Sequence, residues 1–208
     1  MFGSPRRVLS ALFTTTALGA LVTLISPMAA QAGLIDLSAC DNSALSQPFV
    51  PWADLNQYKL APGADFEGSL DGWSLQGGAA ATSGSESFGV TGSVGASSLA
   101  LPSGATATSP ATCVNAAYPS FRLFTRTDTP GATVTVSVVY GSGLGRLVIP
   151  VGLVTPAGSW QPTLPMLTGS AVPGLLNGGD ADVSLRFSAS GGTVQIDDAY
   201  VDPHGRCC

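Results

Sequence analysis

The chain has 208 residues, with 8 Lys and Arg against 13 Asp and Glu, which gives a formal net charge of −5. Only 10% of the residues are charged, whereas disordered chains are charge-rich, so the composition predicts a folded protein. The basic residues are scattered and form no run. This argues against binding to nucleic acid or to an anionic membrane, because both require clustered Lys and Arg.

The first 32 residues have the parts of an export signal. Two arginines precede the uncharged, mainly apolar stretch Val8–Ile25, and Ala30-Gln31-Ala32 supplies the small residues of a cleavage site. We therefore expect residues 1–32 to be a signal peptide that is cleaved between Ala32 and Gly33. The alternative is an uncleaved membrane anchor, since an apolar stretch of 18 residues approaches the length of a membrane span.

Cleavage would leave 176 residues with 6 basic and 13 acidic side chains, a net charge of −7, because the leader holds two arginines and no acid. This length suits a single domain with its own core. We expect the mature chain to be secreted or to reside in the cell envelope. No later segment is long and apolar enough for stable membrane insertion.

The mature chain divides into three parts. Residues 33–62 show little periodicity and contain three prolines, so we expect an irregular N-terminal arm that packs on the domain. Residues 63–203 carry regular strand signals, and residues 204–208 form a C-terminal tail. The cysteines Cys40, Cys113, Cys207 and Cys208 allow three pairings, which the residues alone leave open.

Short runs that alternate apolar and polar residues predict the strands. The clearest is Thr133–Tyr140, where valines alternate with Thr and Ser. The other predicted strands are Ser87–Gly92, Ser97–Leu101, Ala105–Val114, Ser120–Arg126, Arg146–Thr155, Gln161–Leu167, the segment around Val183–Ser188 and Thr193–Val201. The only candidate helix, residues 171–176, is interrupted by Pro and Gly. Eight to ten strands at this spacing predict an all-β fold, a jelly-roll β-sandwich.

The alternation also predicts which side chains form the core of the sandwich. They are Phe66, Trp73, Phe121, Leu123, Val134, Val136, Val138, Val183, Leu185, Phe187, Val194 and Ile196.

The residues offer little for catalysis. The only histidine is His204 in the tail, so a Ser-His-Asp arrangement has a single candidate base, and no two-histidine zinc spacing exists. Three pairs of acids are close in sequence and are either ordinary turn and strand-end acids or the carboxylates of a glycoside hydrolase, and the first and last of these pairs are also candidate calcium ligands. These pairs are Asp65 with Glu67, Asp180 with Asp182, and Asp197 with Asp198.

Two phrases at the ends of the strand-rich region resemble those of galactose-binding-like jelly rolls, the fold of many carbohydrate-binding modules. They are Asp65-Phe66-Glu67-Gly68-Ser69-Leu70-Asp71-Gly72-Trp73 and Gln195-Ile196-Asp197-Asp198-Ala199-Tyr200-Val201-Asp202, and the resemblance covers residues 60 to 203. It implies that the two ends of the jelly roll meet in adjacent antiparallel strands. It also implies a structural calcium ion on Glu67 and Asp198, with Asp65 and Asp197 as further candidate ligands. The chain has Pro62-Gly63-Ala64 in place of the usual Asn-Gly lead.

A second resemblance concerns the cysteines. The segments from Cys40 to Trp52 and around Cys113 are similar to those of a group of exported bacterial proteins of unassigned function. This similarity implies a Cys40–Cys113 disulfide and leaves Cys207 and Cys208 as tail thiols.

A sugar-binding surface requires exposed aromatic rings that stack on pyranoses. Trp52, Tyr118, Tyr140 and Trp160 are the candidates. The sequence thus favours a secreted, non-catalytic binding module for a glycan or another extracellular ligand. The alternatives are a structural or surface-interaction protein of the cell envelope and a hydrolase that uses paired carboxylates.

Overall fold

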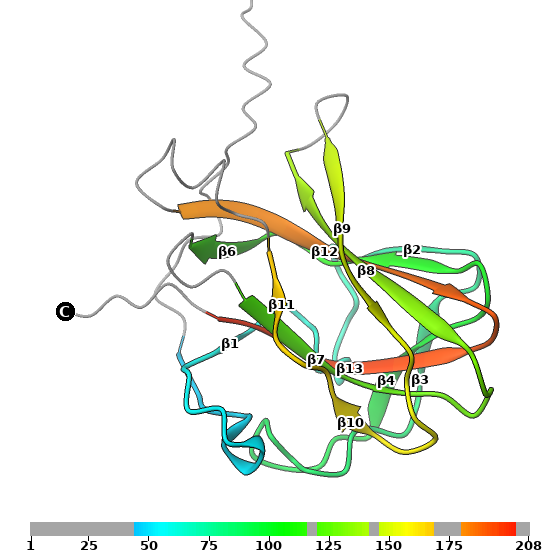
Figure 1. The fold of residues 1–208 in the computed structure, drawn as a ribbon, viewed down its shortest axis with the longest axis horizontal. Helices are drawn as coiled ribbons and strands as arrows, with labels where there is room; N and C mark the ends of the chain where they lie inside the picture. The colour runs from blue at the N-terminus through cyan, green and yellow to red at the C-terminus, as the bar shows by residue number, and fades with distance from the viewer. Residues whose placement is uncertain (1–43, 116–119, 142–145, 169–179, 203–208) are drawn as a thin grey trace, which may run out of the picture. The chain divides into compact units, whose positions relative to one another are not determined.

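The computed structural model describes residues 44–115, 120–141, 146–168 and 180–202, with the side chains of Asn115 and Asp180 left out. All of them belong to one compact unit, Ala32–Cys208. They form two antiparallel β-sheets that lie in two layers, and the one helical element among them is a single turn (Figure 1). The predicted all-β jelly-roll sandwich is confirmed. No helix in this part of the chain has the length and apolar character to cross a membrane.

The first sheet has the strand order β10-β7-β13-β4-β3, with β1 paired to β13 and β11 paired to β7. Its strands are β1 (Lys59–Leu60), β3 (Ala80–Ser83), β4 (Ser97–Leu101), β7 (Ser120–Arg126), β10 (Gln161–Pro162), β11 (Met166–Leu167) and β13 (Val194–Val201). The second sheet has the order β2-β5-β12-β8-β9, with β6 paired to β12. Its strands are β2 (Ser74–Gln76), β5 (Thr106–Thr108), β6 (Thr112–Asn115), β8 (Thr133–Tyr140), β9 (Leu147–Val154) and β12 (Asp180–Ser190).

The main core lies between the sheets, where alternate side chains of facing strands meet. Eleven of the twelve predicted core residues are at most 2% exposed, which confirms the period-two pattern. Trp73 is the exception, since it is only partly buried. Its ring still packs against Phe66 and Phe187, and its indole N–H donates to the carbonyl of Pro62 at 3.1 Å.

A second apolar cluster covers the outer face of the first sheet. It contains Phe49, Tyr58, Phe124, Trp160 and Tyr200. Phe124 on β7 and Tyr200 on β13 alternate with core residues of the same strands and therefore point away from the main core. The N-terminal arm supplies Phe49 and Tyr58, so the arm packs on the outside of this sheet.

The strand bounds differ from the prediction in several places, and the predicted strand Gln161–Leu167 is divided into β10 and β11. Ser87–Gly92 is not a strand, because the Glu86 carboxylate accepts the backbone N–H groups of Phe88 and Val90 and holds a turn there. Ala105–Val114 is divided into β5 and β6 at Pro110. The short strands β1, β2 and β3 were not predicted. The candidate helix at residues 171–176 lies outside the described residues.

The two ends of the jelly roll meet, although not through the expected residues. β1 pairs with β13, with Leu60 opposite Tyr200, and the N–H of Ala61 donates to the carbonyl of Ala199 at 2.9 Å. Residues 65–67 follow this pairing as a turn and not as a strand, and Phe66 within it has a φ of 54°. The expected strand pairing of Asp65–Glu67 is therefore wrong, while the meeting of the two ends is present.

Candidate functional site

The arm forms a closed loop on the outer face of the first sheet. Ser46 and Tyr58 exchange backbone hydrogen bonds of 2.9 and 2.7 Å, which tie the base of this loop. Within it, the 3-10 turn η1 (Val50–Trp52) carries Pro51, whose fixed φ suits the first helical positions. The turn ends at Ala53, which has a φ of 58°. The reversal at Ala53 directs the next residue, Asp54, toward the sheet.

Asp54 forms a buried ion pair with Arg122 of β7. Arg122 Nη1 lies 2.8 Å from Asp54 Oδ2, and the two side chains are 5% and 12% exposed. The Tyr58 hydroxyl donates to the same oxygen at 2.8 Å, and the N–H of Asn56 donates to Oδ1 at 3.1 Å. Burial opposes the ionisation of Asp54, but the hydrogen bonds from Tyr58 and Arg122 outweigh it and hold the pKa of Asp54 below its usual value.

The Arg122 guanidinium is fixed on two further sides. Its Nε donates to the carbonyl of Thr163 at 2.8 Å, and its central carbon lies 4.2 Å from the centre of the Phe49 ring. The cation is therefore neutralised by Asp54 and shielded by an aromatic face. A charge pair held in this way presents polar atoms without a net charge.

Trp52 is held beside this pair by other aromatic rings. Its ring centre lies 5.5 Å from that of Phe124 and 4.8 Å from that of Phe88, both in edge-to-face geometry. Such contacts fix the indole in one orientation. The Trp52 side chain nevertheless stays partly exposed.

These groups line an open pocket with a volume of about 490 Å³, within the range of about 300–1,000 Å³ of small-molecule sites. The lining residues are Trp52, Ala53, Asp54, Leu55, Asn56, Arg122, Leu164 and Pro165. An indole ring, a carboxylate, an amide and a guanidinium thus border one hollow. This combination can stack on an apolar ring face and exchange hydrogen bonds with hydroxyl groups.

The structure places the four candidate sugar-binding aromatics differently. Trp52 lines the pocket. Tyr140 is 1% exposed and its hydroxyl donates to the carbonyl of Thr168, and Trp160 is 8% exposed in the second apolar cluster. Neither of these two rings has a free face for a sugar, so the expectation is wrong for both. Tyr118 lies outside the described residues.

A second polar site surrounds the middle of β13, where acids from several segments meet. Asp197 is fully buried, and its Oδ2 accepts the Ser85 hydroxyl at 2.8 Å and the N–H of Glu86 at 2.7 Å. Glu67 Oε1 accepts the N–H groups of Ala96 and Ser97, both at 2.7 Å. These carboxylates therefore serve as acceptors that hold the turns around β13 and β4.

Asp198 is the member of this acidic cluster on which the charges of the other acids act. It is 3% exposed, has a φ of 44°, and lies at a bulge in the pairing of β13 with β7. Burial, and then the charges of Asp197, Glu86, Asp65 and Glu67, raise its pKa to about 8. Burial likewise raises the pKa of Asp197 to about 7.

The cluster brings together Asp65, Glu67, Asp197 and Asp198, the four acids for which calcium was expected, and adds Glu86. Oxygen donors of this kind suit a hard cation. Among the described residues, however, no set of three or more His, Cys, Asp or Glu side chains is arranged to hold a metal ion. A cation at Asp198 would therefore need backbone carbonyl or water oxygens as well.

The remaining predicted site residues take no part in either site. Asp182 is buried on β12, which pairs it with Cys113 of β6. Cys113 is 7% exposed, but Cys40, Cys207 and Cys208 lie outside the described residues, so the Cys40–Cys113 disulfide stays a prediction. His204 also lies outside them.

Sequence reasoning missed Asp54, Asn56 and Arg122 as site residues. In Trp52-Ala53-Asp54-Leu55-Asn56, the polar residues Asp54 and Asn56 alternate with apolar ones, which weakly indicates that both polar side chains lie on one surface. Arg122 is a charged residue between Phe121 and Leu123 of a buried strand, and a cation in such a place needs a partner. Nothing in the sequence showed that the partner is Asp54.

The sequence matches no protein-family model and no curated protein. Its structure is similar to solved carbohydrate-binding modules. The CBM22-1–GH10 modules of Clostridium thermocellum xylanase 10B with xylohexaose match 68% of this chain with a TM-score of 0.46 and 16% identity, and the match spans 28% of that chain. A xylan-binding domain of CBM family 22 matches 74% of this chain and 99% of its own, with a TM-score of 0.43 and 16% identity. The module TmCBM61 with β-1,4-galactotriose matches 70% of this chain and 98% of its own, with a TM-score of 0.40 and 14% identity. At this identity the likeness concerns the fold alone.

Proposed function

We propose that this protein is a secreted, non-catalytic binding module that holds a glycan in the pocket of Trp52, Asp54, Asn56 and Arg122. One observation carries the proposal: a fixed, partly exposed indole ring borders the same hollow as a neutralised carboxylate–guanidinium pair and an exposed amide. The ring suits the apolar face of a pyranose, and the polar groups suit its hydroxyls.

The side chains that line the pocket are held in fixed positions by their neighbours. Asp54 and Arg122 are held by Tyr58 and Thr163, and Trp52 is held by Phe88 and Phe124. A preorganised site loses little side-chain entropy on binding. The Asp54–Arg122 pair also carries no net charge, which favours neutral sugars over uronic acids.

The lining of the pocket supports binding over hydrolysis. Glycoside hydrolases use two carboxyl groups on either side of the bond that is cleaved. Among the described lining residues Asp54 is the only acid, and its pKa is held low, which suits an acceptor and not a proton donor. The role of a structural or surface-interaction protein of the cell envelope remains the alternative. In this proposal residues 1–32 direct the export of the module and are then cleaved.

A glycan array with the purified mature chain tests the proposal. Trp52→Ala and Asn56→Ala should lose binding to every glycan that the unchanged protein retains, while all three proteins keep their melting temperature within a few degrees. Gln57→Ala is the matched control, because Gln57 is an exposed neighbour that does not line the pocket. An array on which nothing binds, or binding that survives both pocket variants, would contradict the proposal.

We also propose that the acidic cluster around Asp198 binds a structural calcium ion through Asp198 and Glu67, with Asp65 and Asp197 nearby. Four acids act electrostatically on the buried Asp198 carboxylate, which supports this proposal. A calcium ion would supply the positive charge that this cluster lacks. The array should therefore be run with calcium and with a chelator.

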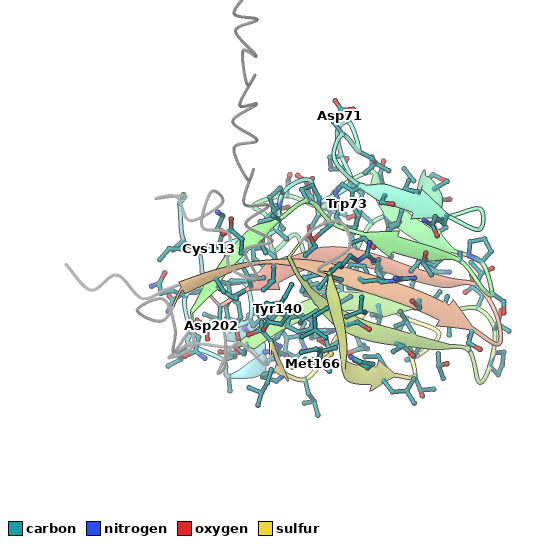
Figure 2. The ribbon with its side chains drawn as sticks, turned by 90° about the horizontal axis from the view of Figure 1, so that it is seen from above. Asp71, Trp73, Cys113, Tyr140, Met166 and Asp202 are labelled. Atoms are coloured by element: carbon teal, nitrogen blue, oxygen red, sulfur yellow. The ribbon has the colours of Figure 1, made fainter. Side chains whose placement is uncertain are left out.

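Melting curves test the calcium proposal directly. Calcium should raise the melting temperature of the unchanged protein and should not raise that of Asp198→Asn or Glu67→Gln. Asp71→Asn is the control, since Asp71 lies at the tip of a projecting loop (Figure 2) and is exposed. A melting temperature that neither calcium nor chelator changes would dismiss the metal.

A further inference from the structure

We call the pocket lined by Trp52, Asp54, Asn56 and Arg122 the glycan pocket. A second hollow adjoins it and has a mainly apolar lining. It has a volume of about 270 Å³ and lies between the end of β9 and the segment that joins β10 to β11. Its lining residues are Gly152, Leu153, Val154, Thr155, Thr163, Leu164 and Met166. We call this hollow the apolar groove. Leu164 lines both the apolar groove and the glycan pocket, so the two share a wall.

The apolar groove is bordered by leucines that are unusually open to solvent. Leu153 is 70% exposed and Leu164 is 83% exposed. Each would gain free energy if a ligand removed its apolar surface from water. Soluble proteins seldom leave contiguous apolar surface uncovered, and where they do, it commonly marks a binding site.

The position of the groove on β9 argues against another protein strand as its occupant. β9 is the last strand in the order of its sheet, but it contains Pro150, which has no N–H, and its pairing with β8 shifts register between Gly152 and Pro150. A proline and a bulge both disfavour the addition of a further strand. An aliphatic group matches the lining of Leu, Val, Met and threonine side chains.

We infer that the apolar groove binds the alkyl chain of a glycolipid-like ligand whose sugar lies in the glycan pocket. The inference rests on the proposed glycan binding and adds the class of ligand: an amphiphile with a neutral sugar head and an aliphatic tail. The shared wall at Leu164 carries this step, because one molecule that passes over Leu164 contacts both hollows.

Gly152 leaves room for the Met166 side chain, which lines the groove. A Cβ added at Gly152 would come within 2.4 Å of Met166 Sδ, so Gly152→Ala must displace the Met166 side chain. Met166 is labelled in Figure 2. The thioether chain is flexible and can move, which makes the change tolerable for the fold. Moving Met166 alters the groove while Trp52, Asp54 and Asn56 stay as they are.

Calorimetric titration with paired glycosides tests the inference. The probes are methyl and n-octyl β-D-glycosides of xylose, galactose and glucose, with the octyl compounds below their micelle concentration. We expect the octyl glycoside of the preferred sugar to bind at least about tenfold more tightly than the methyl glycoside, since several methylene groups leave water. Leu153→Asn and Gly152→Ala should remove most of this advantage and leave methyl glycoside binding unchanged. Trp52→Ala should weaken both.

Leu147→Asn is the matched control, because Leu147 lies at the other end of β9, is 48% exposed and does not line the groove. It should keep the octyl advantage. Equal binding of methyl and octyl glycosides would overturn the inference and leave the proposed glycan binding intact. An octyl advantage that survives Leu153→Asn, or that Leu147→Asn removes equally, would also overturn it. Failure of every glycoside to bind would overturn the inference, while the glycan array decides the proposed glycan binding separately.

Discussion

Asp54 is the residue on which the glycan pocket depends, because it organises the groups around it. Its carboxylate joins the arm, through Tyr58 and Asn56, to the sheet, through Arg122. The pair is almost fully buried, so water could not solvate either charge if its partner were removed. Removing one member of such a pair leaves the other charge uncompensated, which costs more than the pair itself contributes.

Asp54→Asn should therefore destabilise the protein by about 3 kcal/mol. Asp128→Asn is the matched control: Asp128 pairs with Arg126 at 2.6 Å, but its side chain is 78% exposed, and exposed pairs contribute less than about 1 kcal/mol. Urea unfolding of both variants measures the difference. Similar losses of stability in the two variants would show that the Asp54–Arg122 pair is not a buried structural link.

Asp198 should make stability depend on pH in the absence of calcium. Its folded-state pKa of about 8 and that of Asp197, about 7, lie above the values of unfolded carboxyl groups. The folded state then holds protons that the unfolded state has released, so stability falls as pH rises from about 4 to about 8.

Asp198→Asn should reduce this fall and raise the melting temperature at pH 8, because it removes a buried charge. Asn also tolerates a positive φ, so the backbone at 44° is kept. Asp198→Ala is the comparison, because Ala also removes the charge but does not tolerate a positive φ as Asn does. Melting curves in chelator at pH 5 and pH 8 measure the effect. A melting temperature of the unchanged protein that rises between these pH values would contradict the assignment.

At the scale of elements, the turn at residues 65–67 is fastened to the start of β4. Glu67 accepts the N–H groups of Ala96 and Ser97, and a Cβ added at Gly95 would lie 2.4 Å from Glu67 Oε1 and 2.8 Å from Ser85 Oγ. Glycine at position 95 is therefore required for this close approach.

Gly95→Ala should destabilise the protein by roughly 1–3 kcal/mol, since the added methyl group displaces Glu67 from its hydrogen bonds. Gly68→Ala is the control on the other side of the contact: its added Cβ meets nothing within 4 Å and its φ is not positive. That variant should stay within about 0.5 kcal/mol. Thermal or urea unfolding separates the two. Equal stability of Gly95→Ala and Gly68→Ala would show that the Glu67 contact does not hold the turn.

The strands that could be predicted are those whose pattern is set by one buried face. β7 and β8 have the predicted bounds, because period-two alternation reports burial along a single strand. Ser87–Gly92 was predicted wrongly as a strand. The Glu86 carboxylate binds backbone N–H groups there, and the alternation of apolar and polar residues gives no information about such a side-chain hydrogen bond. Propensity and pattern do not describe contacts between segments that are distant in the chain.

For the whole molecule, too, the contacts between segments that are distant in the chain were the ones that could not be predicted. The phrases around Asp65 and Asp198 identified the meeting ends of the jelly roll, and the acidic cluster lies there. The glycan pocket was not predicted, because Asp54 and Arg122 are 68 positions apart and meet only when the arm packs on the outer face of the sheet. The aromatic candidates failed for a related reason: Tyr140 and Trp160 are buried by contacts that no local pattern specifies.

The arm that builds the pocket should itself be fixed by the Cys40–Cys113 disulfide. Cys113 lies buried on β6, next to β12, and a bond to Cys40 would close a loop of roughly 70 residues. Constraining a loop of that length in the unfolded chain contributes about 4 kcal/mol in the chain-entropy model.

Cys40→Ser should therefore lower stability by about that amount and weaken glycan binding, because the arm carries Trp52, Asp54 and Asn56. Cys207→Ser should do neither. Peptide mapping of the non-reduced protein measures the pairing itself, and a peptide that joins Cys40 to Cys207 or Cys208 would contradict it. The two measurements together separate the roles of the bond. A lost disulfide with glycan binding unchanged would mean that the Ser46–Tyr58 bridge and the Asp54–Arg122 pair hold the arm without it.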